Sequence, residues 1–338
     1  MEKEKNMASA YEKTVDIIDH SKDMPAEEAI DALIRCVKAG YNLAFEKAIH
    51  ALADIDHPSV VPALIRLYDW FQADSRKRDR SCDARTAIVE ALGCTGSTQS
   101  ISLLKKAART VERAKLGPRI EDAAISLRAA AAIALAKVDP DCLYELAVLL
   151  FDEKPDVPVS TANRPYEKSP VRRAAAQAIG ILGDAGGMAL LAVKLRFPNG
   201  EVPDVIAECL EALISMRPPY LIEVVKPYLM GFDHNLSAIA AISLSESLGF
   251  EVIDLLYETL EHVSDGTKES ILVAICMAAK GHRIKEILLN FLDHPNEFVR
   301  LGAVKQIKNH LDDEVLRKLR QMRDTDPEIS VRLEAALD

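Results

Sequence analysis

The sequence predicts an all-α protein, a right-handed superhelical solenoid of about nine helix pairs, and three observations favour this fold class. Hydrophobic residues make up 49% of the chain and aromatic residues only 5%. Small helix formers therefore take the place of the β-branched and aromatic residues that sheets favour. Gly and Pro number 14 and 16, too few for a disordered chain. A pattern of small and aliphatic residues also recurs along the whole chain, as repeat architectures require.

The repeated element is a helix that carries a small residue and, four positions later, an aliphatic residue on the same face. Successive copies are about 30–44 residues apart. We anchor the nine copies at Phe45, Arg85, Arg128, Arg172, Ile206, Ala238, Lys268, Arg300 and Arg332. Between them lie segments such as 60–71 and 252–263, whose apolar residues follow the spacing of a second helix. Because neither helix can bury its apolar face alone, neighbouring pairs must stack.

The expected organisation is a polar N-terminal capping helix within residues 1–24 and a single repeat domain over residues 25–338. Three early intervals are longer than the later ones. The excess forms inserted segments at residues 72–83, 105–122 and 151–170. Insertions between paired helices emerge on one edge of a solenoid, so we expect these three segments to be neighbours.

Two turns near the C-terminus carry the most specific motif. Residues 295–307 follow the pattern PxxxVRxxAxxxI, and residues 326–336 are a close variant of it. These turns resemble HEAT repeats, especially the short bacterial type named for phycobilin lyases. The resemblance extends over essentially the whole chain, but only in repeat architecture.

The resemblance also implies a structural role for the arginine of the motif, which pairs in a ladder with an acidic residue of the preceding turn. Arg172, Arg300 and Arg332 occupy that position. The units anchored at Ile206, Ala238 and Lys268 lack the arginine, so we expect the ladder to be interrupted there.

Cysteine and histidine spacing predicts neither disulfides nor a metal centre. The closest two of the six cysteines are 12 positions apart, and no CxxC pair exists. We therefore expect reduced thiols in a reducing compartment. No two of the eight histidines are three or four positions apart, so neither a metal site nor another cofactor is expected. The N-terminus lacks the apolar stretch of a signal peptide, and no window suits a membrane span, which predicts a cytoplasmic protein without membrane contact.

Charge is unevenly distributed along the chain. The net charge is −10, yet residues 66–119 carry 12 Lys or Arg against 6 Asp or Glu. The candidate partner-binding residues on this basic edge are Arg76, Lys77, Arg78, Arg80, Arg109, Arg113, Lys115 and Arg119, with Arg164, Tyr166 and Lys168 in the third insertion. Such a strip could attract phosphate or an acidic partner, although solvated loops often carry similar charges. Trp70 either anchors a partner beside these arginines or borders the packed stripe of residues 61–71.

No catalytic constellation is recognisable, so we do not expect an enzyme. The working hypothesis is a scaffold or adaptor that binds a protein or peptide along its concave surface, a role based on fold analogy. The exposed residues expected there are Lys47, Glu90, Lys137, Gln177, Glu208, Glu211, Ser245, Lys305 and Lys308. The first alternative is a tetrapyrrole-handling protein, as the resemblance to phycobilin lyases implies. The second is an anion-binding protein that uses the basic insertions, with phosphate favoured over nucleic acid because the net charge is negative.

Overall fold

The computed structural model describes residues 12, 15–39, 45–116, 119–151, 170–198, 200–279 and 282–336. Within these ranges the protein consists of helices and one two-stranded antiparallel sheet, so the all-α fold class is confirmed. Backbone contacts divide the chain into two compact units, an N-terminal unit Met1–Leu190 and a C-terminal unit Leu191–Asp338. The repeat domain expected over residues 25–338 therefore contains two such units, and the superhelical path of the whole chain stays a prediction.

The N-terminal unit follows the predicted alternation of two kinds of helix. Residues 15–20 are helical, within the expected capping segment. The elements after them are η1 (Ser21–Asp23), α2 (Ala26–Lys38), α3 (Phe45–Ala53), α4 (Val60–Ala73), α5 (Ser75–Arg78), α6 (Asp83–Cys94), η2 (Thr98–Ser100), α7 (Ile101–Ala107), β1 (Arg113–Leu116), β2 (Arg119–Asp122), α8 (Ile125–Val138), α9 (Leu143–Leu150) and α10 (Pro170–Leu182). The division between the two units falls within α11 (Ala185–Arg196).

The C-terminal unit continues the same alternation. Its remaining elements are α12 (Pro203–Met216), α13 (Leu221–Leu229), α14 (His234–Leu248), η4 (Gly249–Val252), α15 (Ile253–His262), α16 (Asp265–Ala279), α17 (His282–Phe291), α18 (Glu297–Ile307), η5 (Lys308–His310), α19 (Asp313–Thr325) and α20 (Ile329–Ala335).

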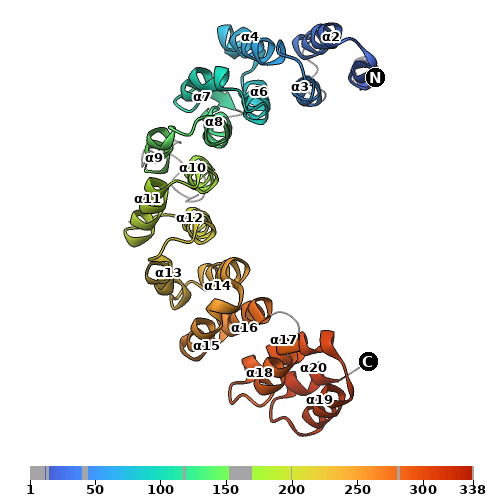
Figure 1. Cartoon of the computed structure of the whole chain (residues 1–338), viewed down its shortest axis with the longest axis vertical. Helices are drawn as coiled ribbons and strands as arrows, with labels where there is room; N and C mark the ends of the chain where they lie inside the picture. Colours follow the sequence, from blue (N-terminus) through green and yellow to red (C-terminus); the bar gives the residue numbers. More distant parts are fainter. Residues whose placement is uncertain are drawn as a thin grey trace. The chain divides into compact units, whose positions relative to one another are not determined.

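Every expected anchor residue lies on a helix. These anchor helices are α3, α6, α8, α10, α12, α14, α16, α18 and α20. In the N-terminal unit, α3 packs on α6, α6 on α8 and α8 on α10 (Figure 1). In the C-terminal unit, α12 packs on α14, α14 on α16, α16 on α18 and α18 on α20. Within each unit, the predicted stacking of neighbouring repeats is therefore confirmed.

Small residues let the anchor helices approach one another closely. Ala131 of α8 and Ala175 of α10 are fully buried. A Cβ atom added to Gly93 of α6 would lie 2.8 Å from the Cβ and 2.9 Å from the Cα of Ala134 on α8. Such a contact is far shorter than van der Waals packing allows. The backbones of α6 and α8 therefore meet at Gly93, which explains the small residues at this position of the repeat.

The turns after the anchor helices use the left-handed backbone conformation that glycine adopts without strain. Gly183 follows α10 with φ of 68°, and Gly249 follows α14 with φ of 57°. At the other helix end, Asp233 accepts hydrogen bonds from the backbone nitrogens of Asn235 and Leu236 and caps α14. Glycine therefore ends α10 and α14, and an aspartate side chain begins α14.

The inserted segments contain secondary structure of their own. The first, residues 72–83, includes the four-residue helix α5. The second, residues 105–122, contains the hairpin β1–β2, in which Arg113 pairs with Asp122 and Leu116 with Arg119. No strand was expected anywhere in this chain, and the hairpin is local to the insertion. The third, residues 151–170, lies outside the described residues except for Phe151 and Pro170.

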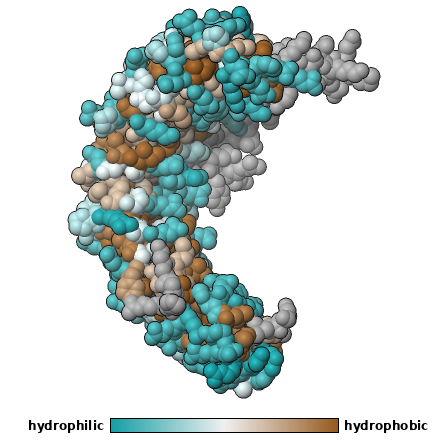
Figure 2. All heavy atoms as spheres, turned by 45° about the vertical axis from the view of Figure 1, so that its right-hand side comes forward, coloured by the Kyte–Doolittle hydropathy of each residue, from teal (hydrophilic) through white to brown (hydrophobic). Residues whose placement is uncertain are grey.

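One stretch, His234–His262, is long and apolar enough to cross a membrane, although no membrane span was expected from the sequence. It comprises α14 and α15, separated by the short turn η4. The 15 residues of α14 span about 22 Å, less than the roughly 30 Å of a hydrocarbon core. Hydrophobic patches also interrupt the hydrophilic surface elsewhere on the chain, on the face seen in Figure 2. The hydropathy of this stretch is explained by the packing of α14 between α12 and α16.

Candidate functional site

Arg85, at the start of α6, joins the first two inserted segments from inside the N-terminal unit. Its side chain is fully buried. Its Nε lies 2.7 Å from Oδ2 of Asp79, and its Nη1 lies 2.8 Å from Oε2 of Glu112. Nη1 also donates a hydrogen bond of 2.9 Å to Oε1 of Gln72. Because Asp79 belongs to the first segment and Glu112 to the second, the expectation that these two insertions are neighbours is confirmed.

The carboxylates keep Arg85 charged, and Arg85 keeps Glu112 charged. Burial lowers the pKa of Arg85, but the hydrogen bonds to Glu112 and Asp79 outweigh burial and raise the pKa above its usual value. Burial raises the pKa of Glu112, but its hydrogen bonds with Arg85 and Ser75 hold the pKa below 4.5. The buried ion pair between Arg85 and Glu112 therefore persists at neutral pH.

The hairpin of the second insertion is fastened to α8 by a second ion pair. Oδ2 of Asp122 lies 2.6 Å from Nη1 of Arg128, which also donates to the carbonyl of Thr110 at 2.8 Å. Oδ1 of Asp122 accepts hydrogen bonds from the backbone nitrogens of Glu112 and Ala124, at 3.1 and 3.0 Å. These contacts fix the backbone at the base of the hairpin, before β1 and after β2.

Three of the predicted basic residues come together in a small pocket beside this ion-pair network. Arg76 of α5, Arg80 of the following turn and Arg113 of β1 line it with Glu112 and Ala114, and its volume is 250 Å³. All three arginines are exposed. The pocket thus gathers arginines from two insertions, 33 positions apart at the nearest.

Two other basic residues of the strip contact acids of the fold. Nζ of Lys77 lies 3.7 Å from Oδ2 of Asp74, and Nη2 of Arg109 lies 3.4 Å from Oε1 of Glu145. Lys115 and Arg119 lie in β1 and β2. The predicted residues Arg164, Tyr166 and Lys168 lie outside the described residues.

Trp70 stacks with basic side chains of its own unit. The guanidinium carbon of Arg78 lies 4.2 Å from the centre of the Trp70 ring, and Nζ of Lys38 lies 5.5 Å from it. Nη1 of Arg78 also donates a hydrogen bond of 2.6 Å to the carbonyl of Trp70. The indole packs edge-on against Phe71 at 4.9 Å. Trp70 therefore borders the packed stripe, as the second interpretation of this residue proposed, and Arg78 covers part of its ring.

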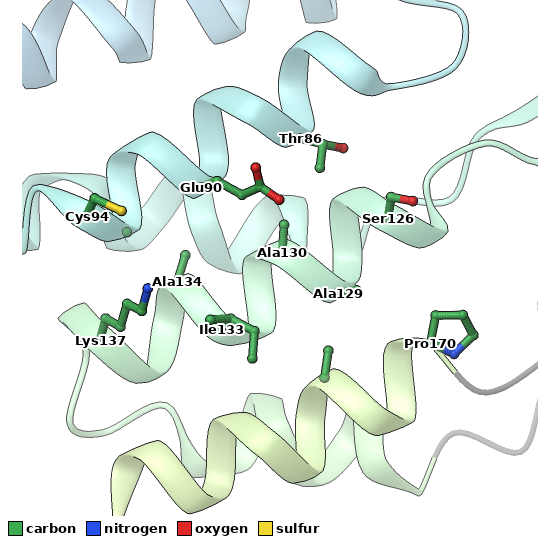
Figure 3. A pocket seen from close by; sticks show the side chains of 12 residues that line it. Thr86, Glu90, Cys94, Ser126, Ala129, Ala130, Ile133, Ala134, Lys137 and Pro170 are labelled. Atoms are coloured by element: carbon green, nitrogen blue, oxygen red, sulfur yellow. The ribbon is translucent and has the colours of Figure 1, made fainter. Parts of the chain in front are cut away.

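A larger groove of 380 Å³ is lined by residues of α6, α8 and α10. Figure 3 shows Thr86 and Ser126 at one end, Cys94 and Lys137 at the other, and Glu90 between them. The remaining lining residues are small or apolar: Gly93, Ala129, Ala130, Ile133, Ala134, Pro170 and Ala174. Burial raises the pKa of Glu90.

Two of the residues expected on the partner-binding face, Glu90 and Lys137, thus line one groove. A third, Ser245, was wrongly expected to be exposed. It is buried on α14, where its hydroxyl donates a hydrogen bond of 2.8 Å to the carbonyl of Ala241. Ser245 was assigned to the wrong face of its helix. A serine can occupy a core position when its hydroxyl donates a hydrogen bond to a carbonyl of its own helix.

The arginines of the repeat motif hold turns together. Arg300 binds Asp326 of the next turn through two bonds, Nε to Oδ2 at 2.9 Å and Nη2 to Oδ1 at 3.1 Å. Nη1 of Arg300 donates to the carbonyls of His294 and Pro295 in its own turn, at 2.9 and 3.0 Å. The structural role of Arg300 is thus clear, although its acidic partner lies in the following turn and not in the preceding one.

In two of the units without arginine, another side chain donates hydrogen bonds to the preceding turn. Nζ of Lys268 donates to the carbonyl of Val263 at 3.0 Å and to Oδ1 of Asp265 at 3.1 Å. In the unit before it, the buried hydroxyl of Ser237 donates to the carbonyl of Leu229 at 2.6 Å. At both sites, a carbonyl before the anchor helix therefore accepts a hydrogen bond from a side chain other than arginine.

The Arg300–Asp326 pair predicts a loss of stability in acid. Burial raises the pKa of Asp326, but hydrogen bonds from Arg300 outweigh burial and hold the pKa below 3.8. Because the folded state then binds the proton more weakly than the unfolded state, the stabilisation is complete above pH 3.8 and is lost as the pH falls through the lowered pKa. We expect urea unfolding, followed by circular dichroism, to show a steeper loss of stability below pH 4 in the wild type than in Asp326→Asn. An equally steep loss of stability in both proteins would contradict this role of the Arg300–Asp326 pair.

The thiols differ sharply in exposure. Burial raises the pKa of Cys82, Cys209 and Cys276 to about 12. It likewise raises the pKa of Cys142 to about 11 and that of Cys36 above its usual value. Cys94, at the end of the groove, is exposed.

We therefore expect Cys94 to be the first thiol to react with iodoacetamide, because alkylation needs an accessible thiolate. Mass spectrometry of peptides sampled over time at pH 8 would measure the six rates. Alkylation of Cys142 or Cys209 as fast as that of Cys94 would contradict the burial of these side chains.

Comparisons with known proteins do not assign the chain to a family. No family model matches it, and no curated protein sequence matches it significantly. Within the described ranges, no three His, Cys, Asp or Glu side chains converge in an arrangement that could hold a metal ion.

Proposed function

We propose that this protein is a non-catalytic adaptor that binds a helical segment of a protein partner in the groove of α6, α8 and α10. The observation that carries the proposal is the groove's lining. Small residues form its floor, the carboxylate of Glu90 lies midway along it, and the ammonium group of Lys137 lies at one end. Small side chains allow a further helix to approach closely, and the two opposite charges would fix its orientation.

The occupant we propose is an amphipathic helix whose apolar stripe lies on the alanines. Helix-in-groove recognition reads apolar residues at one face of such a segment. A basic residue midway along this segment and an acidic residue near one of its ends would complement Glu90 and Lys137. The resemblance to HEAT repeats supports the proposal further, since their second helices normally line the concave surface where partners bind.

The experiment fills the groove and asks whether binding is lost. Ala130 is half-buried on α8 within the groove, and Ala130→Arg would place a long charged side chain over the floor. Ala39→Arg is the matched control, because Ala39 is exposed at the end of α2, where a helix tolerates a cation well. Full-length protein of each form serves as bait, and captured proteins are identified by mass spectrometry.

The proposal requires one partner that binds the wild type and Ala39→Arg, fails to bind Ala130→Arg, and slows the alkylation of Cys94. A partner that Ala130→Arg captures equally well, or that leaves Cys94 accessible, would refute the groove as its site. Unchanged circular dichroism of both variants establishes that they fold. Added phycocyanobilin tests the tetrapyrrole alternative, and a change in its absorbance with wild type but not Ala130→Arg would replace the adaptor by that function.

A further inference from the structure

The pocket of Arg76, Arg80 and Arg113 has the features of an anion site, and it is separate from the groove. Its wall is rigid on the side of Glu112. The backbone nitrogen of Ala123 donates to the carbonyl of Glu112 at 2.8 Å, and Oδ1 of Asp122 holds the backbone nitrogen of Glu112. The pocket is therefore built on the fastened end of the hairpin.

The carboxylate in the pocket is already occupied by partners from the protein. Oε2 of Glu112 accepts the hydrogen bond from Nη1 of Arg85 at 2.8 Å, and Oε1 accepts one from the hydroxyl of Ser75. Asp79, the other nearby acid, is buried and accepts from Nε of Arg85. Counting Arg85, Arg76 and Arg113 against Asp79 and Glu112 leaves an excess of one positive charge at the pocket.

Neighbouring cations contact other groups, so the excess positive charge is confined to the pocket and does not extend along the surface. Arg78 lies over the Trp70 ring, and Arg109 pairs with Glu145. A polynucleotide would need a series of cations spaced along its backbone. A compact cluster of guanidinium groups, each with a planar fork of donors, matches the geometry of a single phosphate group.

We propose that this pocket binds one phosphate group in its dianionic form, through the guanidinium groups of Arg76 and Arg113. The group could be supplied by inorganic phosphate or a small phosphomonoester, or by a phosphorylated side chain of a protein. The two sources share the same recognition chemistry and differ in what surrounds the phosphate. The inference does not depend on the adaptor function, because it uses none of the residues of the groove.

The test measures binding of three probes to the full-length protein by calorimetry at constant ionic strength. The probes are inorganic phosphate, the peptide N-acetyl-Gly-phosphoserine-Gly-amide with its unphosphorylated form, and a single-stranded oligothymidylate. The variants are Arg76→Gln and Arg113→Gln, and the matched control is Arg109→Gln, an exposed arginine of the same strip that contacts Glu145. The fluorescence of Trp70, the single tryptophan, reports whether each variant keeps the fold of the N-terminal unit.

We expect phosphate or the phosphopeptide to bind the wild type and Arg109→Gln equally, and to bind each pocket variant about tenfold more weakly. Binding should also weaken as the pH falls through the second pKa of the phosphate group, which is about 6 for phosphoserine. Tighter binding of the phosphopeptide than of inorganic phosphate identifies a protein source, and the reverse identifies a free ligand. The proposal is overturned if neither binds, if all variants bind equally, or if the oligothymidylate binds best and Arg109→Gln weakens it.

Discussion

Replacing Arg85 with methionine is expected to lower the free energy of unfolding of the N-terminal unit by about 3–5 kcal/mol. Methionine keeps the length and the apolar stem of the side chain but removes its charge. The carboxylates of Asp79 and Glu112 would then lose the cation that both contact at hydrogen-bond distance. Since Asp79 is buried, its charge would have to be neutralised or exposed to water, and either course favours unfolding.

Trp70 makes this effect measurable in the correct unit. It is the single tryptophan of the chain and lies in α4, which packs on α6. Its fluorescence during urea unfolding therefore follows the N-terminal unit without a contribution from the other. Arg78→Met is the matched control, because it removes an exposed arginine that contacts Trp70, and we expect a loss of at most about 1 kcal/mol.

The combination Asp79→Asn, Arg85→Met and Glu112→Gln separates the charge from the packing. When both acids are neutral, no buried charge is left without a partner, so the combined variant should be more stable than Arg85→Met alone. A combined variant less stable than Arg85→Met would mean that hydrogen bonding and shape, not charge, make Arg85 necessary.

The helices and their stacking order could be predicted from the sequence because both depend on short-range pattern. Each anchor residue marks a helix whose small residues repeat every three or four positions, and this spacing alone determines which face is buried. The turns at Gly183 and Gly249 also depend on local sequence, because glycine adopts their positive φ without strain. The division into two compact units was not predicted, because it depends on contacts summed over many residues.

The candidate sites could be predicted only in part. The basic strip identified Arg76, Arg80 and Arg113, but gave no reason to separate them from Lys77, Arg78 and Arg109. That separation depends on which of these side chains line the same pocket in three dimensions. Glu112 and Ser75 were missed altogether. The only signal for Glu112 was an isolated acid within a basic segment, and the sequence does not show that Arg85 would hold it.

Two further differences concern which side chains are exposed. Ser245 was expected on the exposed face of α14 but is buried, because a hydroxyl bonded to its own helix is tolerated in a core. The groove itself was also missed. Ala130 and Ala174 line it, and the sequence cannot distinguish an alanine covered by a neighbouring helix from one that lines an open groove.

The close approach of α6 and α8 predicts a large effect of a single methyl group. In Gly93→Ala the new Cβ would meet the backbone and Cβ of Ala134 at less than 3 Å. A backbone cannot rotate away as a long side chain can, so α6 and α8 must separate. We expect the free energy of unfolding to fall by about 1–3 kcal/mol, the usual cost of overpacking a core, although alanine favours helix formation more than glycine does. Urea unfolding followed by Trp70 fluorescence would measure the change.

Gly302→Ala is the control that isolates the steric effect. Gly302 also lies within an anchor helix, α18, and is buried, but its added Cβ would lie 3.6 Å from Cδ2 of Leu272, an ordinary contact. The higher helix propensity of alanine should then stabilise the C-terminal unit by up to about 1 kcal/mol, as measured by circular dichroism. The two glycine variants should therefore change stability in opposite directions. Equal stabilisation by both would show that α6 and α8 have room to spare at Gly93, and that the groove above this contact is wider than its lining suggests.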